Sequence, residues 1–142
     1  MKREAAFWIV VAVLAAGCQG STGPTLPEVE PLPQVENGNF VLYVSNQSFA
    51  LPRVDITIHI DDKEAVSSDF DVGNQHNWVQ HTFQLDPGKH KLVAASREGS
   101  ALLEQGFEVK DKHWAVVDYW YSKQDGKKQF SFVIQDQPIG FM

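Results

Sequence analysis

The stretch Val54-Asp55-Ile56-Thr57-Ile58-His59-Ile60-Asp61 decides the fold of this chain. Branched aliphatic residues occupy every second position, and polar residues fill the positions between them. Successive side chains of a β-strand point to opposite faces, so this pattern predicts a strand with one face in the core and the other in water.

The same period of two recurs on both sides of this stretch, between clusters of turn residues. Asp86-Pro87-Gly88 and Gln124-Asp125-Gly126-Lys127 are strong turn signals. No stretch shows sustained helical spacing. The segments that we interpret as strands are 40–44, 54–61, 65–72, 76–85, 89–96, 101–109, 112–121 and 129–135. They predict one all-β domain, residues 40–142, built as a small sandwich of seven or eight antiparallel strands.

Residues 1–17 have the features of a targeting segment rather than of a folded domain. Lys2 and Arg3 give a positive start, and Ala5 to Leu14 is an uncharged apolar run. This run is shorter than the roughly 20 residues that a helix needs to span a bilayer. We therefore expect a cleaved secretory signal peptide rather than a permanent transmembrane helix.

The end of this leader, Leu14-Ala15-Ala16-Gly17-Cys18, resembles the lipobox of bacterial lipoproteins. The resemblance implies transfer of diacylglycerol to the Cys18 sulfur, cleavage before Cys18, and acylation of the new amino terminus with a fatty acid such as palmitate. Two or three buried acyl chains hold a protein stably on a membrane. By the sorting rule of enteric bacteria, Gln19 implies the outer membrane, with the protein facing the periplasm or the cell surface.

Between the lipobox and the domain, residues 18–39 contain four of the seven prolines. Proline lacks an amide hydrogen and favours extended polyproline II backbone. The segment is therefore predicted to be a lipidated, Pro-rich flexible tether that holds the domain away from the membrane. A proline-motif ligand for another protein is the alternative interpretation.

Within the domain, Leu85-Asp86-Pro87-Gly88-Lys89-His90-Lys91-Leu92-Val93 resembles a hairpin of PEGA-like, transthyretin-like and other immunoglobulin-like bacterial surface modules. The resemblance implies an immunoglobulin-like sandwich in which His90 packs inward. Another segment, Lys112 to Tyr121, is apolar or aromatic on both faces. This pattern predicts a central strand of one sheet.

Four residues are weak candidates for metal ligands. His81 and His90 fall in apolar registers and would be neighbours across the expected hairpin. Asp69 and Asp71 begin an oxygen-rich stretch that looks like a calcium loop but lacks the distant bidentate glutamate. Packed histidines and ordinary turn chemistry account for both pairs, so we expect no metal and no cofactor beyond the lipid on Cys18.

No catalytic motif is evident in the sequence, which has neither a Gly-x-Ser-x-Gly elbow nor a glycine-rich phosphate loop. We therefore expect a protein that is not an enzyme.

The formal net charge is −6, from 12 basic and 18 acidic residues. Nucleic acid is disfavoured as a partner, because binding it relies on Lys and Arg neutralising phosphate.

Exposed aromatic residues are the remaining candidates for a ligand-binding surface. Trp78, Trp114 and Trp120 could stack on sugar rings or contact a protein partner, although core packing is the favoured interpretation for Trp114 and Trp120. Trp78 lies opposite the apolar register of its strand, so we expect it to be the most exposed.

The sequence predicts a membrane-anchored cell-envelope lipoprotein with a non-catalytic binding or structural sandwich and an envelope protein or glycan as partner. The alternatives are a carbohydrate- or peptidoglycan-binding module and a metal-binding envelope protein.

Overall fold

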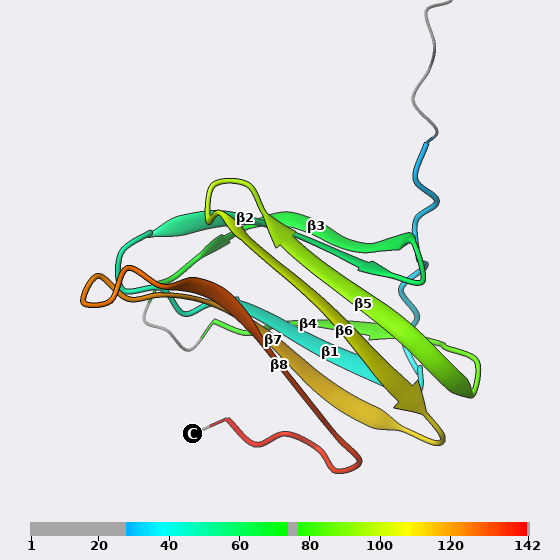
Figure 1. The fold of residues 1–142 in the computed structure, drawn as a ribbon. Helices are drawn as coiled ribbons and strands as arrows, with labels where there is room; N and C mark the ends of the chain where they lie inside the picture. Colours follow the sequence, from blue (N-terminus) through cyan, green and yellow to red (C-terminus); the bar gives the residue numbers. More distant parts are fainter. Residues whose placement is uncertain (1–27, 74–76, 142) are drawn as a thin grey trace, which may run out of the picture.

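The computed structural model describes residues 28–73 and 77–141; the leader, Cys18 and the first part of the predicted tether lie outside these ranges. The described chain is a β-sandwich of two four-stranded sheets packed together (Figure 1). One sheet has the strand order β4-β1-β7-β8 and the other β3-β2-β5-β6. The strands are β1 (Phe40–Asn46), β2 (Arg53–Ile60), β3 (Lys63–Asp71), β4 (Val79–Phe83), β5 (Gly88–Ser96), β6 (Ala101–Val109), β7 (His113–Tyr121) and β8 (Lys128–Gln135). Within the described residues, no helix is long and apolar enough to cross a membrane.

The prediction of an all-β sandwich is confirmed, but two expectations about strand pairing are wrong. β1 runs parallel to β7, with Phe40 beside His113 and Asn46 beside Tyr119, whereas the sequence predicted only antiparallel strands. β4 and β5 lie in different sheets, so Asp86-Pro87-Gly88 forms a crossover and not a hairpin. Turn residues favour a local bend of the backbone, and this bend does not determine whether the flanking strands pair.

The core fills the space between the two inner faces. In β2, the apolar residues at alternate positions, Val54, Ile56, Ile58 and Ile60, are 0–1% exposed, as the alternating pattern predicts. From the other sheet, Ala115, Val117 and Tyr119 of β7 are 0% exposed. β7 lies between β1 and β8 and is therefore the central strand that was expected.

The chain before β1 covers one open side of the sandwich. Leu32 N donates to Glu64 O of β3 at 2.8 Å, and Val35 N donates to Thr82 O of β4 at 2.9 Å. Figure 1 shows this blue segment passing both sheets on its way to β1. An unpaired sheet edge exposes hydrogen-bonding groups that must be satisfied or protected. Residues 30–35 of the predicted tether therefore belong with the folded domain, and we call them the N-terminal strap.

Two buried polar side chains connect distant parts of the sandwich. Asn46 at the end of β1 is 1% exposed, and its amide donates to Leu51 O and to Phe70 O of the other sheet, each at 3.1 Å. Tyr119 of β7 is 0% exposed, and its hydroxyl donates to Gly99 O in the β5–β6 turn at 2.8 Å. Both contacts join the two sheets at the same end of the molecule.

Candidate functional site

The end of the sandwich beyond Asn46 and Tyr121 carries the candidate site. Because β1 and β7 are parallel, the loop after β1 and the turn after β7 leave the sheet side by side. The N-terminal strap meets the sandwich at the other end of β1, beside Phe83 and Phe40. The two loops therefore lie at the end that is farther from the predicted tether (Figure 1).

Phe49 is the most exposed large apolar residue of the described chain, at 69%. Its backbone N donates to Tyr121 O at 3.1 Å, which fixes the loop against the end of β7. In the same loop, Ser48 Oγ accepts from Ala50 N at 3.0 Å and from Leu51 N at 2.8 Å. The loop is thus held by hydrogen bonds while the phenyl ring extends into solvent.

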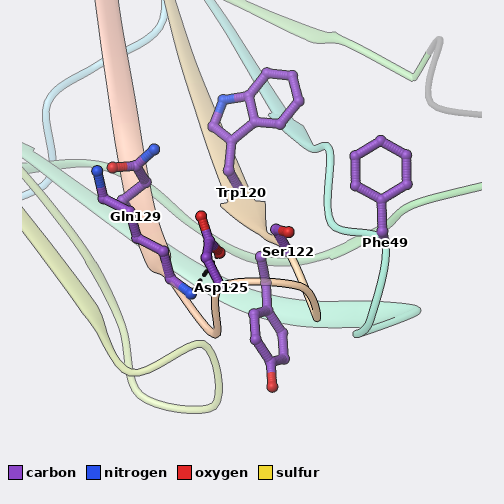
Figure 2. A pocket seen from close by; sticks show the side chains of 7 residues that line it. Phe49, Trp120, Ser122, Asp125 and Gln129 are labelled. Atoms are coloured by element: carbon purple, nitrogen blue, oxygen red, sulfur yellow. Dashed lines mark hydrogen bonds between the residues drawn. The ribbon is translucent and has the colours of Figure 1, made fainter.

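Two depressions that are open to solvent share the lining residues Phe49 and Ser122. The smaller, of about 150 Å³, includes Trp120 and the polar residues Asp125, Lys127 and Gln129; the larger is about 430 Å³. Figure 2 shows the rings of Trp120 and Phe49 projecting to the same side, with Ser122 between them. The arrangement combines aromatic surfaces with a rim of hydrogen-bonding groups.

Several hydrogen bonds orient the groups of this site. Trp120 Nε1 donates to Ser131 Oγ at 3.0 Å, so the indole N–H is already engaged and the ring offers mainly its apolar surface. In the turn, Lys127 N donates to Asp125 Oδ1 at 2.9 Å, and Gln124 N donates to Ser122 Oγ at 3.3 Å. These bonds hold the rim residues in place beside the aromatic pair.

Trp78, which was expected to be the most exposed tryptophan, is half-buried. Its ring stacks on Phe141 of the C-terminal segment with centroids 4.2 Å apart, and its Nε1 donates to Asp118 Oδ1 at 3.0 Å. Burial raises the pKa of Asp118 above its usual value, against the hydrogen bonds from Ser45 and Trp78, which lower it. Trp114, also half-buried, has the Lys112 ammonium 5.4 Å from its ring centroid. The three tryptophans therefore do not form one surface, and Trp120 alone lines the candidate site.

The weak metal candidates are not brought together. His81 lies in one sheet and His90 in the other, so the expectation that they are neighbours across a hairpin is wrong. His90 Nδ1 contacts Asp61 Oδ2 at 2.5 Å, and its Nε2 contacts Asp86 O at 2.7 Å. Asp69 and Asp71 are exposed residues of strand β3 and do not lie in a loop. Among residues 28–73 and 77–141, no three His, Cys, Asp or Glu side chains are arranged to hold a metal ion.

His81 has an unusual environment, and we predict that replacing it increases stability. Both ring nitrogens are buried without a hydrogen-bond partner among the described residues, and burial lowers the pKa of the imidazole. A buried unsatisfied polar group costs about 1–3 kcal/mol, so His81→Leu should raise the free energy of unfolding by about 1 kcal/mol at pH 7.5. Urea denaturation measures this difference.

The same substitution should also change the dependence on pH. The pKa of His81 is lower in the folded than in the unfolded chain, so His81 itself contributes a loss of stability as pH falls below about 6.5, and the variant without it escapes this loss. The advantage of His81→Leu should therefore grow between pH 7.5 and 5.5. His59→Leu, on the outward face of β2, is the control and should give no gain. An advantage of His81→Leu that stays constant over this pH range would contradict the prediction.

The sequence analysis missed Phe49, although one signal was present. Ser45-Asn46-Gln47-Ser48 marks a loop, and a phenylalanine immediately after such polar residues, before the next alternating strand, has no obvious place in either core face.

No protein-family model, curated protein or solved structure matches this chain.

Proposed function

We propose that this chain is a membrane-anchored cell-envelope lipoprotein whose immunoglobulin-like sandwich is a non-catalytic binding module. The lipobox resemblance at Leu14 to Cys18 supports the lipid anchor. By the Gln19 sorting rule, the anchor lies in the outer membrane and the module faces the periplasm or the cell surface. The immunoglobulin-like character rests on the two-sheet arrangement and the inward-packed His90.

One observation carries the binding part of this proposal. The hydrogen-bonded loop that exposes Phe49 lies at the end of the sandwich opposite the N-terminal strap. A chain tied to a membrane through its N-terminal side presents that end outward. An apolar ring held in solvent by a fixed loop has little value for the stability of the fold, whereas it contributes to binding without a large entropic cost.

The lipid anchor is tested by metabolic labelling of the full chain. Cells grown with radiolabelled palmitate should incorporate the label into the wild-type protein, which should fractionate with membranes. Cys18→Ala should lose the label and leave the membrane fraction. Ser21→Ala, three residues further along the predicted tether, is the control and should retain both properties. Label in Cys18→Ala equal to that in the wild type would refute the anchor.

A further inference from the structure

We propose that the Phe49–Trp120 site binds the glycan strand of the cell wall, a chain of N-acetylated sugar rings; this inference rests on the proposed function, which puts the module in the envelope. The faces of sugar rings are apolar patches of C–H groups, and exposed aromatic side chains stack on such patches. The site offers Phe49 and Trp120 on the same side of the strand end (Figure 2).

The hydrogen-bonding groups around these rings match an acetamido sugar. An acetamido group carries one N–H donor and one carbonyl acceptor. The rim of the smaller depression has the Asp125 carboxylate as an acceptor, and the Lys127 ammonium and the Gln129 amide as donors. Ser122, which lies between the two aromatic rings, belongs to both depressions and can accept or donate.

The shape of the site favours a chain over a single small molecule. Pockets for small ligands usually bury about 70–90% of the ligand's surface. Here the two depressions, of about 150 Å³ and 430 Å³, share Phe49 and Ser122 and are open to solvent, so they do not enclose a ligand in this way. A linear oligosaccharide can extend past Phe49 and Ser122, which both depressions share, and place successive sugar rings in the two depressions.

The charges of the site argue against anionic partners. The smaller depression pairs Lys127 with Asp125, and the larger one includes Lys123, so the two depressions together carry a formal charge of +1. The chain as a whole carries −6. Binding a phosphate-rich polymer or an anionic headgroup relies on several Lys or Arg side chains, and one net positive charge is a weak basis for it, whereas glycan recognition through stacking and hydrogen bonds needs none.

Cosedimentation of the detergent-solubilised full chain with purified peptidoglycan tests the inference. The wild type should sediment with the polymer, and soluble chitohexaose should compete. Phe49→Ala should weaken binding at least tenfold, and Phe49→Trp should restore it, because stacking needs a ring rather than phenylalanine itself. Leu102→Ala removes another apolar side chain, 66% exposed on the other sheet, and should bind as the wild type does.

Three results would overturn the glycan inference: no sedimentation of the wild type, unchanged binding by Phe49→Ala, or binding that excess chitohexaose leaves intact. Because Phe49 is 69% exposed, its truncation should not disturb the fold, and an unchanged thermal melting curve would verify this. Trp120→Phe, which keeps a ring but loses the bond to Ser131, should bind within about threefold of the wild type.

A photo-crosslinking amino acid at position 49, used in intact cells, separates failure of the glycan inference from failure of the proposed function. An adduct that a muramidase releases supports the glycan. An adduct that only a protease releases overturns the glycan inference but leaves a binding module in the envelope. No adduct at all, together with absence of palmitate label, would overturn both.

Discussion

Replacing Tyr119 with alanine is expected to lower the free energy of unfolding by about 4 kcal/mol, the largest effect that we predict for a single residue. Tyr119 is fully buried and is among the largest such side chains of the described core. Its ring packs edge-on against Phe130, with centroids 5.6 Å apart. The substitution leaves a cavity between the sheets and also removes the hydroxyl that bonds Gly99 O. Urea denaturation followed by tryptophan fluorescence measures the loss.

Tyr119→Phe separates the hydrogen bond from the packing of the ring. It keeps the aromatic volume but leaves Gly99 O, on a buried residue, without the 2.8 Å bond, so we expect a loss of about 1–2 kcal/mol. Tyr43→Phe, on the outer face of the same sheet beside Phe141, should change stability by less than about 0.5 kcal/mol. Equal losses for the two Tyr→Phe variants would show that the Gly99 contact contributes nothing specific.

Asn46→Ala is expected to cost about 3 kcal/mol, although the side chain is small and polar. The amide donates to Leu51 O and Phe70 O, and its oxygen accepts from Ser48 N at 3.0 Å. Alanine leaves all three backbone groups without this partner at a position that is 1% exposed. Thermal and urea denaturation of the purified variant measure the effect.

A matched asparagine provides the control for this prediction. Asn77 is exposed and, among the described residues, donates a long bond of 3.4 Å to Val72 O, so Asn77→Ala should change stability by less than about 0.5 kcal/mol. If Asn46→Ala were as mild as Asn77→Ala, the bonds of Asn46 would not be what connects β1 to the Phe70 strand. Asn46→Ala should also weaken peptidoglycan binding, because Ser48, which orients Phe49, would lose its contact with residue 46.

The strands were predictable because their signal is local. Val54 to Ile60 alternates with a period of two, and a half-buried strand requires this period whatever lies next to it. Lys112 to Tyr121 is apolar on both faces, and this pattern also matches its surroundings. Val116, on the outer face of the sheet, is only 8% exposed. In such cases, the residues of a strand indicate by themselves whether one or both of its faces are buried.

Strand pairing was less predictable because it depends on contacts between residues far apart in the sequence. Asp86-Pro87-Gly88 has the residues of a tight turn, and Gly88 adopts a φ of 126° that favours glycine. The same residues serve equally well in a crossover between sheets. Likewise, nothing within β1 indicates that its neighbour is β7 rather than β2. The residues on which the resemblance to a bacterial hairpin rested are therefore equally compatible with a crossover between sheets.

The candidate site was only partly predictable for a related reason. Trp120 was identified from its residue type. It lines the same depression as Phe49 because β1 and β7 run parallel, so that the loop after β1 lies beside the end of β7. Trp78 followed the alternation rule and does lie on the outer face, yet the rule could not show that Phe141 would cover it. The few residues after β8 show no alternating pattern, so their sequence does not indicate which part of the sheet they cover.

The parallel neighbours β1 and β7 also determine the order in which the domain can fold. Ser45 and Asp118, whose side chains meet in this pair, are 73 residues apart, whereas the β2–β3 and β5–β6 hairpins need only local chain closure. Contacts between such distant residues slow folding, because a long loop must close before they contribute. In a polypeptide that passes through a secretion channel with its N-terminus first, the earliest strand to emerge must remain unpaired on that edge until the seventh has followed. Under the proposed export, the apolar surface of this strand would remain exposed, and so prone to aggregation, for most of the passage.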